Sequence, residues 1–293
     1  MAATWGLPRY ARFVERLASF ARVVMWDKRG TGMSDRVSPD RLPTLEERVQ
    51  DLTAVLDAAG CERPALFGLS EGALVSALHA ARNQDRVSSL VLYGGWASSL
   101  PAGDCPGVMT AEVGEAFISG VAESWETVED LLWIWAPEAS DDPRTRSWWA
   151  DAMHAGASPA AAVAWLEMSK TMDIRSALPD IASPTLVLHR VADLIIPVAN
   201  ARYLASQIAG ARLVELDGDA HLWWFGDEDA LLDEVEEFLT GARGPREHQR
   251  AVMTVLFTDI TASTTRLAEL GDRRWRDLIS DHEHEVERQI TRF

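Results

Sequence analysis

Three side chains that together can activate a hydroxyl group for attack on a carbonyl carbon occur at well-separated points of the sequence. Ser70 lies at the centre of the run GLSEG, residues 68–72, between an apolar run and a helix-like run. A serine hydroxyl is a poor nucleophile alone, so it needs a base to accept its proton and a sharp turn that exposes it. Asp193 and His221 follow in that order, each shortly after a later apolar run. We therefore expect Ser70 to be the nucleophile, His221 its general base and Asp193 the acid that orients the histidine.

The acid has alternatives in the sequence. Asp217 and Asp219 closely precede His221, so either could be its partner instead. Asp193 could also cap a helix that starts near Pro197, because aspartate is favoured at helix N-termini. The histidine has no such competitor, since of the seven histidines only His221 follows a predicted strand at the required point.

The hydrophobic pattern predicts the elements that must position these residues. Five apolar runs of strand length are predicted strands, at residues 23–26, 65–67, 89–93, 185–189 and 212–216. Helical patterns lie around and between them, at residues 7–19, 46–59, 71–83, 198–209 and 229–239. This alternation predicts an α/β fold with a mostly parallel sheet and helices on both faces.

The segment from about residue 100 to 180 breaks the alternation, since it contains six tryptophans but no strand pattern. Tryptophans in such a segment mostly pack helices against one another. We also expect a helical cap over a pocket, with some of these indole rings facing an apolar ligand.

Residues 26–35, WDKRGTGMSD, resemble the segment that follows the fourth strand in the α/β-hydrolase superfamily. Together with the turn around Ser70, residues 1–240 resemble that superfamily from its fourth strand to its eighth. The resemblance implies a serine hydrolase that cleaves a small-molecule ester, lactone or amide through an acyl-enzyme, without a cofactor. It also implies that the backbone N–H of Glu71 stabilises the oxyanion of the reaction.

The superfamily has three strands before that segment, and the loop after the third donates a second N–H to the oxyanion. This chain opens about one helix before residue 23, so we expect a domain that lacks its first three strands and that donor. In the superfamily the third strand lies between the fourth and the fifth, inside the sheet. The sequence is therefore expected to be a fragment or to have a misassigned start.

The overall composition argues against several classes of protein. The 293 residues contain 28 Lys and Arg against 45 Asp and Glu, a net charge of −17 that disfavours nucleic-acid binding. No run approaches the ~20 apolar residues of a membrane-spanning helix, and the N-terminus lacks the pattern of a secretory signal. Two cysteines make no disulfide scaffold. A cytoplasmic protein without nucleic-acid or membrane partners is expected.

The character of the chain changes near residue 240. Residues 241–250 have the composition of a linker. The run TVLFTDITAST, residues 254–264, resembles the opening strand of class III adenylate and guanylate cyclases. The resemblance implies that residues 251–293 begin a cyclase domain, in which Asp259 and the Ile260 carbonyl bind Mg²⁺ or Mn²⁺. It further implies ATP or GTP as the substrate of a complete cyclase domain, and a homodimer formed through that domain.

Two functions follow from this organisation. The first is a serine hydrolase attached to a cyclase in a signalling protein. The second is a hydrolase fold that binds a small molecule and regulates the cyclase, with little or no hydrolysis. The fusion motivates the second, because attached cyclase domains usually take their input from a neighbouring domain.

Overall fold

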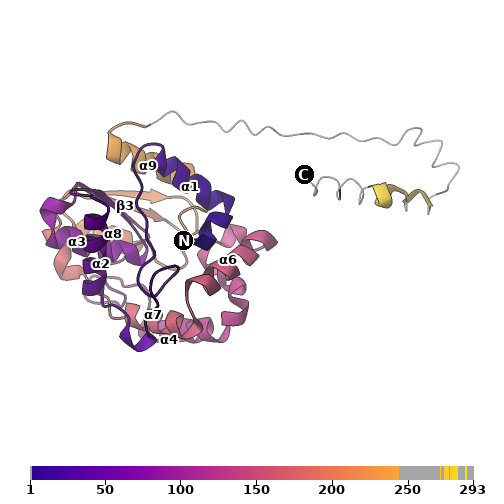
Figure 1. Ribbon diagram of the computed structural model, residues 1–293, viewed down its shortest axis with the longest axis horizontal. Coiled ribbons are helices and arrows are strands. Elements are labelled where there is room, and N and C mark those ends of the chain that lie inside the picture. The colour runs from indigo at the N-terminus through magenta and orange to yellow at the C-terminus, as the bar shows by residue number, and fades with distance from the viewer. Residues whose placement is uncertain (1, 244–270, 272–273, 277, 283–287, 289–293) are drawn as a thin grey trace. The chain divides into compact units, whose positions relative to one another are not determined.

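The computed structural model describes residues 2–243, 271, 274–276, 278–282 and 288. The chain divides into two units, Met1–Pro245 and Arg246–Phe293. In the second unit the described residues are helical. The first unit holds the sheet, its covering helices and the candidate site, drawn from indigo to orange in Figure 1.

The described part of the first unit contains a parallel sheet of four strands in the order β1-β2-β3-β4. The strands are β1 (Ala65–Leu69), β2 (Ser89–Tyr93), β3 (Thr185–Arg190) and β4 (Arg212–Leu216). Leu69 pairs with Tyr93 and Tyr93 with Leu188, while Arg190 pairs with Leu216. This register brings the carboxyl ends of all four strands to one edge, which is where ligands bind in parallel α/β sheets.

Helices supply the crossovers that parallel strands require. The α-helices of the described residues are α1 (Pro8–Ala18), α2 (Leu45–Ala58), α3 (Glu71–Arg82), α4 (Ala111–Glu123), α5 (Leu132–Trp135), α6 (Pro143–Gly156), α7 (Pro159–Ser169), α8 (Ala199–Gln207) and α9 (Glu228–Thr240). Short 3-10 helices are η1 (Ala2–Gly6), η2 (Pro39–Arg41), η3 (Gln84–Arg86), η4 (Trp125–Leu131), η5 (Pro137–Ala139) and η6 (Arg175–Asp180). In Figure 1, α2, α3 and α8 lie together on one side of the sheet, and α1 and α9 lie side by side on the other.

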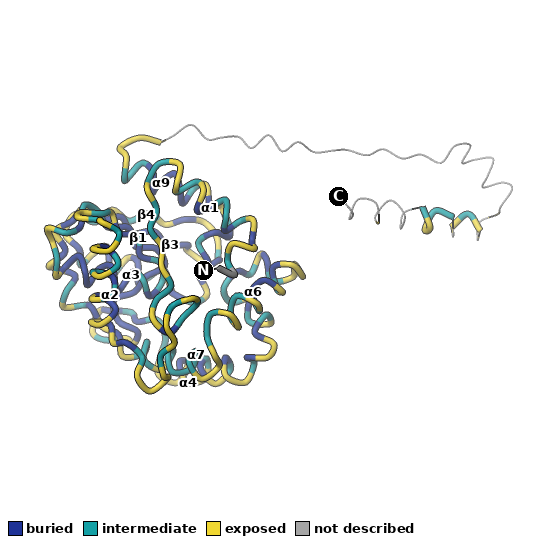
Figure 2. The backbone as a smooth tube through the Cα atoms, viewed as in Figure 1, coloured by how far each residue is buried: buried dark blue, intermediate teal, exposed yellow. Residues whose placement is uncertain are grey.

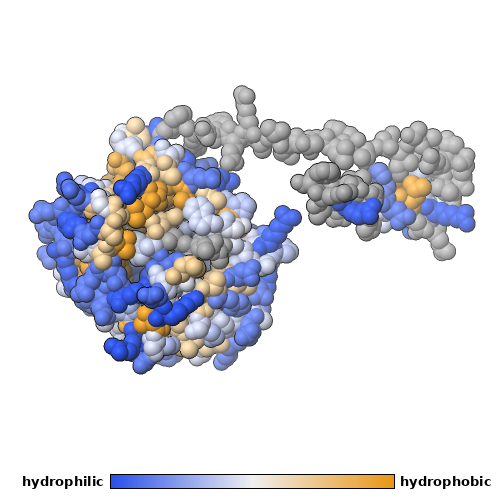
Figure 3. Space-filling model, in the orientation of Figure 1, coloured by the Kyte–Doolittle hydropathy of each residue, from blue (hydrophilic) through white to orange (hydrophobic). Residues whose placement is uncertain are grey.

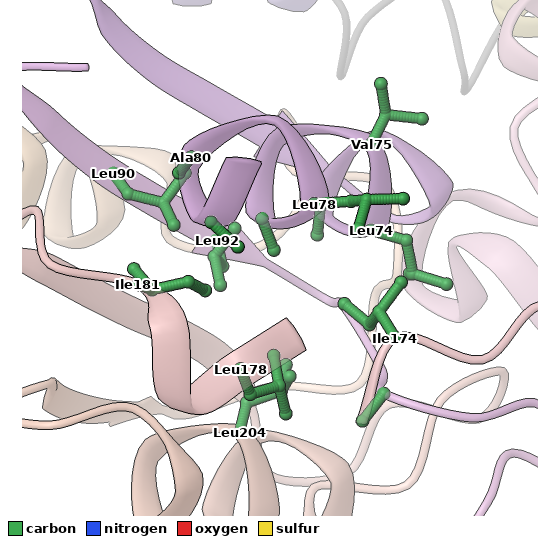
Figure 4. Packing of buried hydrophobic residues seen from close by; sticks show 14 of the residues in the cluster. Leu74, Val75, Leu78, Ala80, Leu90, Leu92, Ile174, Leu178, Ile181 and Leu204 are labelled. Carbon is green, nitrogen blue, oxygen red and sulfur yellow. The ribbon is translucent and has the colours of Figure 1, made fainter. Parts of the chain in front are cut away.

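The core has two parts because side chains of a strand alternate between the faces of its sheet. In β2, Leu90 and Leu92 pack into the cluster with α2, α3 and α8, whereas Val91 and Tyr93 pack into the cluster with α1 and α9. Figure 4 shows the leucines of β2 beside α3 and η6, with Leu204 of α8 nearby. Full burial of a leucine contributes about 1.5–3 kcal/mol. The predicted class, an α/β fold with a parallel sheet and covering helices, is confirmed.

Burial follows the same layers. The two central strands, β2 and β3, are mostly buried, whereas β1 and β4 at the edges of the sheet are only partly buried. Figure 2 shows exposed residues on the outer turns of the helices. Most of the face visible in Figure 3 is hydrophilic, apart from an apolar area beside α1 and α9. None of the described helices is both long and apolar enough to cross a membrane.

The predicted strand at residues 23–26 is wrong. These residues have no regular structure, and Met25 and Trp26 are 38% and 39% exposed. An apolar run becomes a strand only where a neighbouring strand pairs with its backbone. Among the described residues β1 is the edge of the sheet and pairs with β2 alone, so residues 23–26 have no partner there. The apolar pattern indicated partial burial, not pairing.

The segment between β2 and β3 consists of helices α4 to α7 and short 3-10 turns. Helices α4 and α7 contact each other and lie together at the lower end of Figure 1. Within this segment Trp125, Trp148 and Trp149 are buried, whereas Trp133 is 54% exposed. The buried tryptophans pack helices together, so the segment forms a helical cover beside the carboxyl edge of the sheet.

Candidate active site

Ser70 occupies a sharp turn between β1 and α3. Its φ of 54° and ψ of −123° make it the one described non-glycine residue with a positive φ. Such backbone strain costs about 1–3 kcal/mol and persists only where the surroundings enforce it. The Ser70 amide donates to the Tyr93 carbonyl at 2.8 Å, and the Ser70 carbonyl accepts from the Ala73 amide at 2.9 Å. The turn is therefore held from both the sheet and the helix.

The two flanking glycines are not equivalent. A Cβ at Gly68 would lie 2.6 Å from the backbone of Ala73, so only glycine allows the helix to start this close to the strand. A Cβ at Gly72 would meet nothing within 4 Å. The close packing of the turn therefore depends on Gly68.

The three predicted residues come together at the carboxyl edge of the sheet. His221 Nε2 lies 2.9 Å from Ser70 Oγ, and His221 Nδ1 lies 2.7 Å from Asp193 Oδ2. His221 is 1% exposed and Asp193 is 8% exposed. Because Nδ1 faces a carboxylate, it carries the proton, which leaves Nε2 free to accept the proton of the serine hydroxyl.

The other oxygen of Asp193 is also fixed. Asp193 Oδ1 accepts hydrogen bonds from the amides of Ile195 and Ile196, at 2.8 and 3.0 Å. Burial raises the pKa of this carboxyl. The opposing effects of His221, through its hydrogen bond and its charge, and of the Ile196 amide are larger in sum, so the pKa lies below its usual value. Helix α8 begins at Ala199 without a side-chain cap, so Asp193 faces the histidine instead of capping that helix. Of the alternative acids, Asp217 is exposed and Asp219 half-buried, while the His221 imidazole is bonded to Asp193.

His221 is held by groups from distant parts of the chain. Its backbone amide donates to the carbonyl of Trp135 at 2.8 Å, and the Trp135 ring lies edge-on to the imidazole at 5.5 Å. The Tyr93 hydroxyl donates to the Ala220 carbonyl at 3.1 Å. The histidine therefore depends on β2 and on α5 as well as on its own loop.

Two glycines after β2 make room for the site. Gly94 has a φ of 58°, and a Cβ there would lie 3.1 Å from His221 Cε1. A Cβ at Gly95 would lie 2.5 Å from Ala73 Cβ. Neither glycine was predicted from the sequence, although a Gly-Gly pair directly after a predicted strand is a signal for such a site.

A pocket opens beside Ser70 under the helical cover. Its apolar lining consists of Trp96, Leu100, Val108, Met109, Phe117, Trp135, Trp165, Leu166, Ile195 and Ile196. Its polar lining besides Ser70 consists of Ser99, Thr110, Ser169 and Lys170. The cavity measures about 70 Å³, well below the ~300 Å³ or more of most small-molecule sites. The enclosed space beside Ser70 is therefore small.

Glu71 begins α3, so its backbone N–H belongs to the first turn, which has no intrahelical acceptors. Its side chain is buried, although a glutamate at this position carries no sequence signal for burial. The predicted metal ligands Asp259 and Ile260 lie outside the described residues. Within the described residues, no group of three or more His, Cys, Asp and Glu side chains could hold a metal ion.

Three features define an α/β-hydrolase. They are the order of the parallel sheet, the strained serine turn at the end of β1 and the helical cover between β2 and β3. The family described as serine aminopeptidase, S33, matches residues 5–228, and the chain belongs to that family. Hydrolases of this kind need no cofactor.

Relatives and solved structures agree with this classification. A putative carbamate hydrolase, RutD, of Klebsiella pneumoniae is 29% identical over 233 residues, which cover 77% of this chain and 85% of that protein. The enol-lactonase from Burkholderia xenovorans LB400 is 28% identical with a TM-score of 0.67, covering 80% of this chain and 86% of that one. A hydrolase from Pseudomonas aeruginosa PA01 is 27% identical with a TM-score of 0.66, covering 79% of this chain and 84% of that one.

Proposed function

We propose that the first unit is a serine hydrolase that cleaves small-molecule esters, lactones or amides through an acyl-enzyme. The observation that carries the proposal is the continuous chain of hydrogen bonds from Asp193 through His221 to Ser70, at 2.7 and 2.9 Å. This series of hydrogen bonds ends at Ser70, which lies in a strained turn beside an apolar pocket.

In the first half of the reaction, Ser70 Oγ attacks the carbonyl carbon while its proton moves to His221 Nε2. The carbonyl oxygen becomes an oxyanion, and the Glu71 N–H donates a hydrogen bond to it. Asp193 stabilises the positive charge that develops on the imidazole. The bond to the leaving group then breaks, and the His221 proton passes to the leaving oxygen or nitrogen.

In the second half, water replaces the leaving group. His221 Nε2 accepts a proton from water, whose oxygen attacks the acyl carbon on Ser70. The tetrahedral intermediate collapses, the bond to Ser70 Oγ breaks, and His221 returns the proton to the serine. The free acid leaves, and all three residues are restored.

The pocket and the relatives narrow the substrates worth testing. The mostly apolar lining favours an apolar acyl or leaving group. The names of two relatives add carbamates and enol-lactones as candidate classes. The test is a panel of short-chain aryl esters, γ-lactones, enol-lactones and N-substituted carbamates, assayed with wild type and Ser70→Ala. Turnover of at least one class that Ser70→Ala loses supports the proposal, and turnover that is equal in both proteins overturns it.

The cyclase function of residues 251–293 is proposed from their sequence alone. Residues 251–270 lie outside the described residues, and the family match ends at residue 228. In this proposal Asp259 and the Ile260 carbonyl bind Mg²⁺ or Mn²⁺ for a cyclase reaction on ATP or GTP in a homodimer. The alternative function, a ligand sensor with little hydrolysis, rests on the same tail. Cyclic nucleotide output of the full-length gene product, measured for wild type and Ser70→Ala with and without hydrolase ligands, separates the two.

A further inference from the structure

The residue after the proposed nucleophile, Glu71, carries a buried carboxylate that takes no part in the proposed reaction. Glu71 is 5% exposed and Arg48 of α2 is 6% exposed. Arg48 Nη1 lies 2.9 Å from Glu71 Oε1, and Lys28 Nζ contacts Glu71 Oε2. Two basic side chains from separate parts of the chain therefore form ion pairs with one carboxylate at the first turn of α3.

The helical cover joins the same group. The indole N–H of Trp165 in α7 donates to Glu71 Oε2 at 3.1 Å. The Lys28 ammonium lies 4.6 Å from the centre of the Trp165 ring, within the range of a cation–π contact. We call Lys28, Arg48, Glu71 and Trp165 the Glu71 cluster. It links the loop after α1, helix α2, the nucleophile turn and the cover.

The charge of Glu71 is stable near neutral pH. Burial raises the pKa of its carboxyl, but the charges of Lys28 and Arg48 and the hydrogen bonds outweigh it and lower the pKa below the usual value. The carboxylate therefore remains ionised near neutral pH.

The position of the cluster connects it to the reacting groups. Ser70 and Glu71 share one peptide unit, so a shift of the Glu71 Cα changes the direction of the N–H that follows Ser70. The conformation of Ser70 is strained and must be enforced by its neighbours. Trp165 also lines the pocket together with Ser70, so the pocket wall includes a residue that is hydrogen-bonded to Glu71.

We propose that the Glu71 side chain is a positioning group for the hydrolysis. The Glu71 cluster holds the first turn of α3 so that the Glu71 N–H points at the oxyanion, and it ties that turn to the cover through Trp165. The inference rests on the proposed function. It goes further by assigning a role to the side chain of Glu71 and to Lys28, Arg48 and Trp165.

The test measures how fast a fluorophosphonate probe labels Ser70, at several probe concentrations, so that the limiting rate and the half-saturating concentration are separated. Loss of one oxyanion donor costs about 10²–10³-fold in other hydrolases, and a displaced donor costs less. For Glu71→Gln, which keeps the side-chain shape, we expect a limiting rate lower by roughly 10-fold with little change in half-saturation. Lys28→Met loses one of two cations and should slow labelling by a smaller factor, which Lys28→Arg restores.

A matched control is available on the same pair of helices. Arg82 of α3 and Glu46 of α2 form an ion pair at 3.2 Å, with side chains 49% and 57% exposed. Arg82→Met removes a charge between α2 and α3 at the far end of α3, so its labelling rate should equal that of the wild type. The melting temperature is recorded for every variant, because a purely structural cluster would lower it without slowing the chemistry.

The outcomes are distinct. Folded Glu71→Gln and Lys28→Met proteins with the wild-type limiting rate overturn the inference and leave the proposed function standing. If Glu71→Gln does not fold, Lys28→Met decides, since the Lys28 side chain is 40% exposed and its loss is tolerated more easily. A folded wild-type protein that is not labelled at Ser70 overturns the proposed function and this inference together.

Discussion

The hydroxyl of Tyr93 donates a hydrogen bond to the carbonyl of Ala220, 3.1 Å away. The backbone carbonyl of the same tyrosine accepts the amide hydrogen of Ser70 at 2.8 Å. One residue at the end of β2 therefore holds both the turn of the nucleophile and the residue before the histidine. The hydroxyl is buried, so the hydrogen bond is shielded from water.

Tyr93→Phe should destabilise the protein and loosen His221. The variant leaves the Ala220 carbonyl without its buried donor, which costs about 1–3 kcal/mol in the free energy of unfolding. Urea unfolding measures the loss, and kcat/KM should fall with it. Tyr203→Phe, on α8 and away from the triad, is the control and should stay within about 0.5 kcal/mol of wild type. Equal stability of the Tyr93→Phe and wild-type proteins would contradict the role of this hydrogen bond.

The acid of the triad can be assigned by exchanging each candidate aspartate for asparagine. Asp193→Asn should lower kcat by as much as ~10⁴-fold, because an amide stabilises the wrong tautomer of the histidine. Asp217→Asn and Asp219→Asn should retain activity, since the His221 imidazole is hydrogen-bonded to Asp193. Steady-state kinetics on the best ester of the panel decides among the three. A large loss in either control, with Asp193→Asn active, would reassign the acid.

The sequence revealed the parts of the site that have local signals. The turn around Ser70 is encoded by five consecutive residues, 68–72. Asp193 and His221 follow predicted strands in a fixed order along the chain. These three residues lie close together because each follows the carboxyl end of a strand, and these ends share one edge of a parallel sheet.

The contacts that hold the site had no local signal. Tyr93 and Ala220 are far apart in the sequence, and so are Lys28, Arg48 and Glu71. Residues 23–26 failed as a strand for the same reason, since pairing depends on a distant partner that an apolar run does not specify. Side-chain type and spacing therefore predicted which residues meet at the candidate site better than which residues hold them in place.

Arg190 should be essential for the loop that carries His221. Its side chain is 1% exposed and donates to the carbonyls of Asp217 and Phe225, on either side of the histidine. Arg190→Met leaves these carbonyls unpaired, so we expect a loss of about 2–4 kcal/mol in the free energy of unfolding.

A second variant tests the same packing from the other side. A Cβ at Gly226 would lie 2.7 Å from Arg190 Cζ, and Gly226 has a φ of 73°. Gly226→Ala should therefore destabilise the protein, whereas Gly210→Ala, also at positive φ but with open space around it, isolates the cost of backbone strain. Similar losses in the two alanine variants would show that the Arg190 contact adds nothing.

Stability should fall below about pH 6.5 because of two buried histidines. Burial lowers the pKa of His189 and of His79 below the ordinary value of 6.5. The unfolded chain therefore binds protons that the folded protein does not, so the free energy of unfolding decreases as the pH falls through this range and is unaffected above it. Each histidine contributes at most ~1.4 kcal/mol per pH unit. The lowered pKa values of Asp193 and Glu71 act only at lower pH, where the stability they contribute is lost.

Urea unfolding between pH 5.5 and 7.5 measures this slope. His79→Gln and His189→Gln should each flatten it, but only His189→Gln should also reduce activity. The reason is that His189 Nε2 donates to the Ile196 carbonyl at 2.7 Å across the loop of Asp193, whereas His79 contacts Thr53 of α2. A wild-type slope of zero in this range would contradict the neutral state of both histidines.

We propose above all that Ser70 is a nucleophile activated by His221. Mass spectrometry of the folded protein after reaction with a fluorophosphonate probe shows whether Ser70 reacts. We predict one added phosphonyl group, on the peptide that contains Ser70, absent in Ser70→Ala and formed far more slowly in His221→Ala. An unmodified Ser70 peptide in the folded wild-type protein, or equal labelling of the His221→Ala protein, would contradict the claim.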